Sequence, residues 1–335
     1  MKHVAVLGEG AWGTAIATLL AQNGFTVHLW CYHKEVAQEI RTKKTNSRYL
    51  PGILLSDFII PTTDLAELFN KSSIIFEAVP VQYLRSTLEN CKKYLRSDQK
   101  WIVLSKGIEN KTLLLPTQML DDVLGPVAHK AVLVGPSFAG DVATEQITAV
   151  TLATTDCDFG LELQKMLSND FFRPYLSLDL IGVQIGGALK NVIALAIGML
   201  DGAGYSDNVK SFILTRGLHE MMLICQLRGG RPETVFGLSG VGDLVLTAMG
   251  ERSRNREVGK RIGSGQTIQR ILEQTGYIPE GVNTAASINQ LIEEFSLDLP
   301  VCKGVYQIII GTKKIDDLLN ELMKRPLEQE CVIKN

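Results

Sequence analysis

The segment 4–14 reads V-A-V-L-G-E-G-A-W-G-T, so a short apolar run leads directly into Gly8-x-Gly10-x-x-Gly13. This spacing is typical of a dinucleotide-binding βαβ unit, in which the first glycine makes the tight turn, the second admits the pyrophosphate and the third packs the helix on the sheet. A helical stretch and a second apolar strand follow at 14–22 and 25–30. The sequence therefore predicts a dinucleotide whose phosphates lie at the helix N-terminus, rather than a glycine-rich turn without a ligand.

Strand and helix patterns continue to alternate through the first half of the chain. Further strands are expected at 73–80, 101–105, 131–135 and 148–153. From about residue 181 only helices are expected, at 181–200, 208–228, 255–262, 266–275, 281–295, 303–309 and 313–324. Alternation of this kind predicts an α/β fold with a doubly wound, mostly parallel sheet. We expect a Rossmann domain at 1–180, followed by an all-helical substrate-binding and catalytic domain at 181–335.

Composition and charge favour a small-molecule partner. The 335 residues carry 34 basic and 36 acidic side chains, a formal net charge of −2 that gives no sign of a nucleic-acid partner. Six cysteines without a C-x-x-C pair indicate reduced thiols and no metal site, and the N-terminus shows no secretory signal, so we expect a cytoplasmic protein. The apolar window 180–200 is long enough to span a membrane, but Gln184, Lys190 and Asn191 at its centre predict a buried helix instead.

Lys190 is expected in the middle of that apolar helix, where burial of an ammonium is costly and lowers its pKa. Gly187 and Gly186 lie three and four residues before it and have no side chains, which suggests room for a ligand beside the amine. A lysine of this kind suits proton transfer to and from a carbonyl oxygen. The alternative, a salt-bridged core lysine, stays open from spacing alone.

Three further parts of the sequence carry polar groups that suit contacts with a ligand. Ser253, Arg254, Asn255 and Arg256 place guanidinium and amide donors at the start of a predicted helix, which suits a phosphate or carboxylate, or else forms a solvated helix start. Asp243 is either a turn cap or a hydrogen-bond acceptor for a hydroxyl or ammonium. Lys106 follows a strand at the edge where open α/β sheets bind ligands, so it is either a substrate contact or a surface lysine; Pro80 and Pro136 mark two other strand ends at this edge.

Taken together, these motifs resemble the bacterial NAD(P)-dependent glycerol-3-phosphate dehydrogenases from end to end. The resemblance rests on an ordered set of motifs: G-E-G-A-W-G-T-A from residue 8, S-K-G from 105, G-P-S-F-A from 135, G-G-A-L-K-N-V from 186, G-D-L from 242 and S-R-N-R from 253. It implies a Rossmann domain, a helical substrate domain, a homodimer and reversible reduction of dihydroxyacetone phosphate to sn-glycerol 3-phosphate for phospholipid synthesis.

The resemblance also implies roles for individual residues. Lys190 matches the family's general acid/base and Lys106 a second active-site lysine, and Asp243 is implied as a third catalytic residue. The implied substrate contacts are Lys106, Gly135, Ser137, Lys190, Asp243, Ser253, Arg254 and Asn255. The implied cofactor contacts are Gly8, Gly10, Ala11, Trp12, Gly13, Tyr32, His33, Lys106, Ala139, Arg254, Ile278 and Glu280. No metal is implied.

Two other readings stay open: a reductase for another small oxo-acid such as ketopantoate, and a catalytically silent NAD(P)-binding regulatory protein. Retention of both lysines and of Arg254 with Asn255 argues against the silent protein.

The nucleotide preference is predicted from the end of the second strand. NAD-specific sites usually place an Asp or Glu there to accept from the ribose 2′-hydroxyl, whereas this strand ends in Cys31-Tyr32-His33-Lys34, before Glu35. We therefore expect NADPH to be accepted at least as well as NADH, with His33 or Lys34 near the 2′-phosphate.

Overall fold

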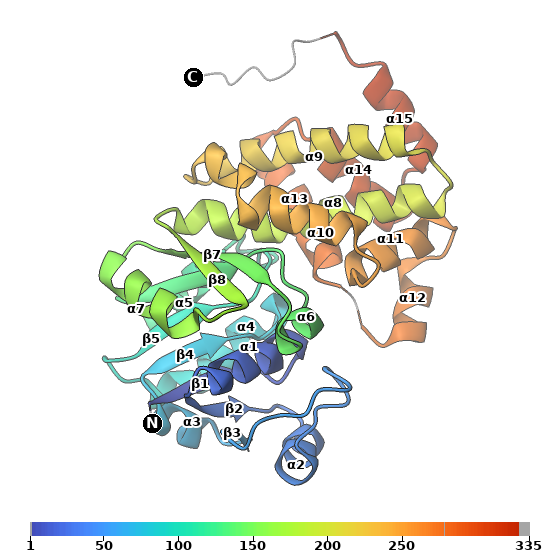
Figure 1. Ribbon diagram of the computed structural model, residues 1–335. Coiled ribbons are helices and arrows are strands. Elements are labelled where there is room, and N and C mark those ends of the chain that lie inside the picture. The colour runs from blue at the N-terminus through green and yellow to red at the C-terminus, as the bar shows by residue number, and fades with distance from the viewer. Residues whose placement is uncertain (1, 278, 328–335) are drawn as a thin grey trace.

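The computed structural model describes residues 2–277 and 279–327, and within these ranges the first half of the chain forms one eight-stranded sheet (Figure 1). The strand order is β3-β2-β1-β4-β5-β6-β7-β8, and every neighbouring pair is parallel except β6 with β7. The strands are β1 (His3–Leu7), β2 (Thr26–Trp30), β3 (Ile59–Thr62), β4 (Ile74–Glu77), β5 (Lys100–Val103), β6 (Lys130–Val134), β7 (Thr148–Thr154) and β8 (Phe172–Ser177).

Helices cover both faces of this sheet and bury a separate apolar layer on each. One layer holds apolar residues of α1 (Ala11–Gln22), α2 (Lys34–Lys43), α6 (Ala139–Ala143) and α7 (Cys157–Leu167). The other holds those of α3 (Leu65–Lys71), α4 (Val81–Cys91) and α5 (Pro116–Leu124), and a short 3₁₀ turn, η1 (Lys92–Tyr94), follows α4. The predicted doubly wound, mostly parallel sheet is therefore confirmed.

The second half of the chain is helical throughout its described residues. Its elements are α8 (Leu180–Gly202), α9 (Asp207–Leu227), η2 (Pro232–Phe236), the π-helix η3 (Leu238–Gly242), α10 (Asp243–Met249), α11 (Arg254–Gly263), α12 (Ile268–Thr275), α13 (Glu280–Phe295), α14 (Pro300–Ile309) and α15 (Ile315–Met323). Sequence patterns missed α10 and η3, which are too short to show a clear helical period.

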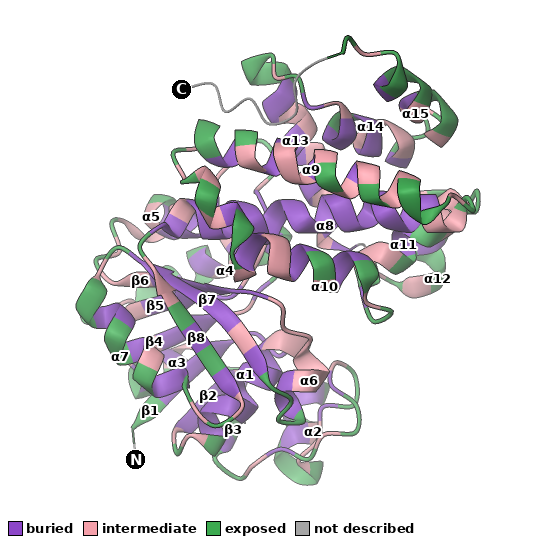
Figure 2. Ribbon diagram, turned by 45° about the horizontal axis from the view of Figure 1, so that its top comes forward, coloured by how far each residue is buried: buried purple, intermediate pink, exposed green. Residues whose placement is uncertain are grey.

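Helix α8 is the centre of this half, and Figure 2 shows it buried along most of its length. By length and composition it could cross a membrane, but 94% of its most apolar window is buried inside the protein. It packs against α9, α10, α11, α13 and α14, which together cover its sides. The apolar character of α8 is thus explained by its place in the protein core.

The crossing of α8 with α11 brings the two backbones into direct contact. A Cβ added at Gly198 would lie 2.1 Å from the carbonyl oxygen of Arg256, and one added at Gly202 would lie 1.9 Å from that of Lys260. The same holds in reverse, because Cβ atoms at Gly259 and Gly263 would meet carbonyl oxygens of α8 at 2.2 and 2.0 Å. Glycine at four-residue spacing on both helices therefore sets how closely they approach.

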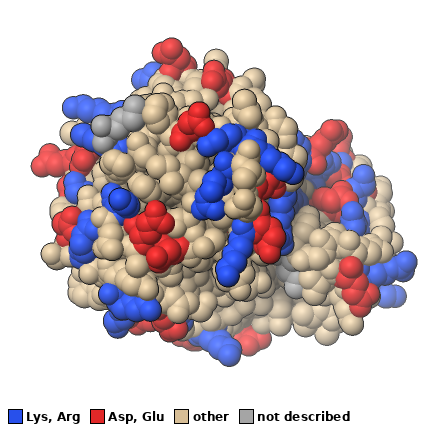
Figure 3. Space-filling view, turned by 90° about the horizontal axis from the view of Figure 1, so that it is seen from below, with Lys and Arg blue, Asp and Glu red and all other residues tan. Residues whose placement is uncertain are grey.

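Charged side chains of both signs share the surface. On the face shown in Figure 3, Lys and Arg lie beside Asp and Glu over much of the area, in keeping with 34 basic and 36 acidic residues in the whole chain.

Candidate active site and dinucleotide cradle

The three glycines of the loop after β1 have the separate roles that their spacing predicts. Gly8 has a φ of +125°, and a Cβ there would lie 2.9 Å from the carbonyl oxygen of Ala78 on the neighbouring strand connection. A Cβ at Gly13 would lie 2.1 Å from the carbonyl oxygen of Gly8, whereas a Cβ at Gly10 would have nothing within 4 Å. Gly8 and Gly13 are thus required by packing, and Gly10 borders open space at the start of α1.

That open space fits a bound dinucleotide. Gly10 is the N-cap of α1 and supplies no side-chain cap, so the first N–H groups of the helix are available to an anion. Ala11 and Trp12 follow, and the indole Nε1 of Trp12 is buried without a hydrogen-bond partner among the described residues. The loop lies between β1 and β4, where the strand order of the sheet reverses. Open α/β sheets bind their ligands at this point.

The turn after β2 is in contact with a carboxylate that the sequence pattern did not place there. Glu9, the second residue of the fingerprint, accepts hydrogen bonds from the backbone N–H of Tyr32 (2.6 Å) and of His33 (3.3 Å), and its Oε1 lies 2.6 Å from Nδ1 of His33. The expectation that no carboxylate precedes Glu35 at this turn is therefore wrong. It failed because Glu9 reaches the turn from the loop that follows the neighbouring strand β1.

Tyr32 and His33, both predicted cofactor contacts, border this turn. The side chain of Tyr32 is largely exposed, and the ring of His33 lies between that of Tyr32 and that of Tyr49, with centroids 5.1 and 6.3 Å away. The guanidinium of Arg48 lies 5.2 Å from the centre of the Tyr49 ring. An arginine thus stands near the turn, although none is present at the strand end itself.

The structure brings Lys106, Lys190 and Asp243 together into what we call the lysine–aspartate cluster. Nζ of Lys190 lies 2.6 Å from one carboxylate oxygen of Asp243, and Nζ of Lys106 lies 2.8 Å from the other. Nζ of Lys190 also donates to Oγ1 of Thr247 at 2.8 Å. Lys106 comes from the loop after β5, so one aspartate joins the Rossmann half to the helical half.

Burial and charge set the protonation of this cluster. Burial lowers the pKa of Lys190 to about 8, a shift that the Asp243 carboxylate opposes and the Lys106 ammonium reinforces. Burial by itself would raise the pKa of Asp243, but the ammonium groups of Lys106 and Lys190 outweigh it and hold that pKa below its usual value. Asp243 therefore stays ionised while Lys190 can exchange a proton near neutral pH.

The glycines before Lys190 do not leave the open space that we expected. A Cβ on Gly186 would lie 2.7 Å from the carbonyl oxygen of Ser239, and one on Gly187 would lie 2.8 Å from Cγ1 of Val134 and 3.6 Å from Cγ of Lys106. These two glycines let η3 and β6 pack on α8, and that close packing places Asp243 beside Lys190. The salt-bridged alternative for Lys190 also holds, since its partner is Asp243.

Asp243 owes its position to an irregular turn that sequence reasoning did not find. It is the first residue of α10 and directly follows the π-helix η3, a type of distortion that is frequent at functional sites. Thr247, one turn later, donates through Oγ1 to the carbonyl oxygen of Asp243 and accepts from Lys190. Sequence analysis did not name Thr247. Its spacing of four residues from Asp243 places both side chains on one face of a helix, and this was the signal that could have found it.

The segment that begins at Ser253 divides into three structural roles. Ser253 caps α11, since its Oγ accepts from the N–H of Arg256. Asn255 joins three helices, because its amide donates to Oδ1 of Asn191 at 2.9 Å and accepts from the N–H of Gly281 at 3.0 Å. Arg254 is exposed and lies 5.5 Å from the centre of the Tyr277 ring.

Arg256 does not share the predicted anion site. Its guanidinium is paired with Asp201 on α8 at 2.6 Å, so this arginine holds α11 to α8. Arg254 is thus the arginine of this segment that stays available to a phosphate.

The remaining predicted contacts lie at the same edge of the sheet. Gly135 follows β6, Ser137 donates to the carbonyl oxygen of Gly135, and Ala139 opens α6. Glu280 opens α13 and accepts from the N–H of Val81 at 3.4 Å, and burial raises its pKa to about 7. Ile278 lies outside the described residues.

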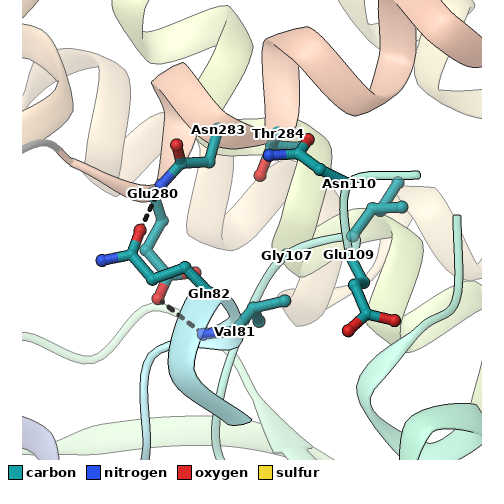
Figure 4. A pocket seen from close by; sticks show the side chains of 9 residues that line it. Val81, Gln82, Gly107, Glu109, Asn110, Glu280, Asn283 and Thr284 are labelled. Atoms are coloured by element: carbon teal, nitrogen blue, oxygen red, sulfur yellow. Dashed lines mark hydrogen bonds between the residues drawn. The ribbon is translucent and has the colours of Figure 1, made fainter. Parts of the chain in front are cut away.

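Glu280 also lines a pocket between α4, the loop after Lys106 and α13. Figure 4 shows its side chain directed toward Val81 at the start of α4. The other lining residues are Gln82, Gly107, Ile108, Glu109, Asn110, Asn283 and Thr284. Among the residues that the structure describes, no group of three His, Cys, Asp or Glu side chains could hold a metal ion.

The edge at the carboxyl ends of the strands therefore carries the glycine loop after β1, Lys106 and the titratable amine of Lys190. This combination of fold and site defines the class of nicotinamide-dependent dehydrogenases that carry a helical second domain. Family models for the NAD-dependent glycerol-3-phosphate dehydrogenase N-terminus and C-terminus match residues 3–159 and 179–320. The chain belongs to this family of dehydrogenases.

Comparisons with individual proteins agree with this family assignment. The chain is 40% identical over 333 residues to the glycerol-3-phosphate dehydrogenase [NAD(P)+] of Citrifermentans bemidjiense, covering 99% of each protein. It is similar to the crystal structure of glycerol-3-phosphate dehydrogenase from Coxiella burnetii, with 31% identity, a TM-score of 0.92 and coverage of 97% of this chain and 99% of that one. A ketopantoate reductase from Ralstonia eutropha shares only the fold, at 13% identity, a TM-score of 0.59 and coverage of 95% and 99%.

These findings confirm the predicted family, fold class and NAD(P) dependence. The predicted NADPH preference and the residue roles stay predictions.

Proposed function

We propose that this enzyme reversibly reduces dihydroxyacetone phosphate to sn-glycerol 3-phosphate with NAD(P)H and so supplies glycerophospholipid synthesis. The observation that carries the chemistry is the lysine–aspartate cluster, because it places a buried amine with a pKa of about 8 at the ligand edge of the sheet. The nicotinamide cofactor, when bound, supplies the hydride that adds to C2 of the ketone.

Lys190 then acts as the proton donor. Its ammonium protonates the C2 oxygen as hydride arrives, and its neutral amine takes the proton back in the reverse direction. The Lys106 ammonium stabilises the negative charge that develops on the same oxygen. Asp243 holds both ammonium groups in place through its two carboxylate oxygens.

The substrate phosphate is assigned to the start of α11. Arg254 offers a guanidinium there, and Ser253 and Asn255 form the frame that holds it. Gly135 and Ser137 border the substrate at the end of β6. For the cofactor, we assign the pyrophosphate to Gly8, Gly10, Ala11, Trp12 and Gly13, and the adenosine end to Tyr32 and His33. Further cofactor contacts are proposed at Lys106, Ala139, Arg254 and Glu280. Ile278 is kept as a contact on the family resemblance alone.

The proposal also includes the domain boundary, the cellular location and the oligomeric state of the enzyme. We keep a domain boundary near residue 180, in the short connection between β8 and α8. Free thiols at Cys31, Cys91, Cys157, Cys225 and Cys302 suit a cytoplasmic location, where thiols stay reduced. A homodimer is proposed from the family resemblance, and light scattering of the purified enzyme tests it.

A turnover assay with dihydroxyacetone phosphate and NADPH tests the function. We expect oxidation of NADPH that depends on the substrate and yields sn-glycerol 3-phosphate. Turnover of ketopantoate instead would assign the chain to another reductase, and nucleotide binding without turnover of either ketone would make it a silent binding protein.

A further inference from the structure

The carboxylate of Glu9 ties the phosphate-binding loop to the turn after β2. Its Oε2 accepts from the N–H of Tyr32 at 2.6 Å, and its Oε1 accepts from the N–H of His33 at 3.3 Å and lies 2.6 Å from Nδ1 of the same histidine. The Glu9 side chain is only 5% exposed. A buried carboxylate is thus satisfied entirely by groups of one turn.

The backbone of Glu9 is fixed as well. Its carbonyl oxygen accepts from Oγ1 of Thr14 and from Nδ2 of Asn46, each at 2.9 Å, and Asn46 is fully buried. Asn46 also donates to Oγ1 of Thr14 at 2.9 Å. Glu9 is therefore held at both ends, so its carboxylate can act as a rigid support.

This support determines which way the imidazole of His33 points. An ionised carboxylate accepts hydrogen bonds and cannot donate them, so the Nδ1 that faces Glu9 must carry a proton. The rings of Tyr32 and Tyr49 lie beside the imidazole, which restricts rotation. Because Nδ1 is engaged by Glu9, Nε2 is the ring nitrogen left for a ligand, and 30% of the His33 side chain is exposed.

The turn after β2 is where Rossmann domains recognise the 2′ position of the adenosine ribose. A histidine with Nδ1 protonated can accept the 2′-hydroxyl proton at Nε2 when the ring is neutral, and can donate to a 2′-phosphate when the ring carries both protons. The Glu9 carboxylate, which would otherwise repel a 2′-phosphate, is meanwhile engaged by the two backbone N–H groups and by Nδ1 of His33.

We propose that Glu9 is a positioning residue that fixes His33 so that Nε2 recognises the 2′ substituent, and that this pair sets the selectivity between NADPH and NADH. The inference rests on the proposed function only in taking NAD(P) as the ligand. It goes beyond the fingerprint, which assigns no role to the residue between its first two glycines.

Direct binding of cofactor fragments provides the test. Adenosine 2′,5′-bisphosphate and 5′-AMP differ at the 2′ position, and calorimetry on the whole enzyme gives both affinities without any turnover. We expect His33→Ala and Glu9→Gln each to weaken binding of the bisphosphate about tenfold while changing 5′-AMP much less, because each removes one charge-assisted contact or its support.

Combining the two substitutions shows whether Glu9 acts by positioning His33 or by the repulsion between its own charge and the 2′-phosphate. If Glu9 acts through His33, adding Glu9→Gln to His33→Ala has no further effect on the ratio of the two affinities. If the Glu9 carboxylate acted only by repulsion, the enzyme would instead bind the bisphosphate more tightly after Glu9→Gln, with or without His33→Ala. This outcome overturns the proposal. Glu35→Gln is the matched control, since it removes an exposed carboxylate two residues from His33 and should leave the ratio unchanged.

A spectroscopic measurement on the unmodified enzyme tests the proposal even where the variants fail to fold. In alkaline solution the ¹⁵N shifts of the His33 ring, assigned by their loss in His33→Ala, should show a proton on Nδ1 and none on Nε2. The opposite tautomer overturns the proposal. Turnover of dihydroxyacetone phosphate with NADH is measured in parallel, so a failure of the proposed reaction is seen separately from a failure at the 2′ position.

Discussion

At the scale of single residues, Lys190 has the amine whose removal should affect the reaction most. Lys190→Met keeps the length and apolar bulk of the side chain but cannot give a proton, so kcat should fall about 10²- to 10⁴-fold with little change in NADPH affinity. Lys210→Met is the matched control, because Lys210 pairs with Asp201 and Asp207 away from the cluster. Activity within a few-fold of wild type would remove Lys190 from the mechanism.

The pKa of Lys190 gives the two directions of the reaction opposite pH dependence. Reduction requires the ammonium, so its kcat/KM should fall as the pH rises through about 8, whereas oxidation of glycerol 3-phosphate requires the amine and should rise over the same range. Burial also raises the pKa of Glu77 and Glu280, to about 8 and 7, so a single profile would be ambiguous. Profiles of both directions with slopes of the same sign would contradict the assignment.

Arg254 is expected to recognise the substrate phosphate. Arg254→Gln should lower kcat/KM for dihydroxyacetone phosphate by a factor equivalent to about 2–5 kcal/mol, and hardly change the weak activity on dihydroxyacetone. Arg256→Gln is the control, since its partner is Asp201 and its loss should reduce stability without changing the ratio of the two activities. Equal losses on both substrates in Arg254→Gln would assign this arginine another role.

Sequence reasoning found single residues of the site but not their partners. Lys190 was conspicuous as a charge in an apolar helix, and Lys106 as a cation at a strand end. Asp243 lies 53 residues from Lys190 along the chain, and no local pattern predicts that η3 brings the two within 2.6 Å. Glu9 was likewise hidden, because its contact with His33 depends on the adjacent packing of β1 and β2.

At the scale of elements, the glycines of the crossing between α8 and α11 should be sensitive to a single added methyl group. Gly198→Ala would place Cβ 2.1 Å from a carbonyl oxygen, so we expect a loss of about 1–3 kcal/mol in the free energy of unfolding. Gly140→Ala on α6 is the control, because its nearest neighbour would lie 3.7 Å away. Denaturant unfolding of both variants measures the difference, and equal stabilities would show that the helices can separate freely.

The strands that sequence analysis missed share a physical cause. Both β3 and β8 contain a proline, at Pro61 and Pro174, and proline is evidence against a central strand. The sheet order places β3 at one edge and β8 at the other, where a missing N–H costs little. The fingerprint, the inner strands and the long helices were predicted correctly because their periodicity and spacing are local properties.

At the scale of the whole molecule, the order in which the chain is made has a consequence for α8. The helices that cover it, α9, α10, α11, α13 and α14, all follow it in the sequence. During synthesis, a 23-residue apolar segment therefore leaves the ribosome before these five helices exist, when of its main packing partners only β6 and β7 have been made. A chain that stops at residue 202 should consequently sediment with aggregates or membranes, whereas the full chain should stay in the supernatant. Until α14 has been translated, the apolar surface of α8 lacks part of its cover, so we expect the incomplete chain to be the form most prone to aggregation.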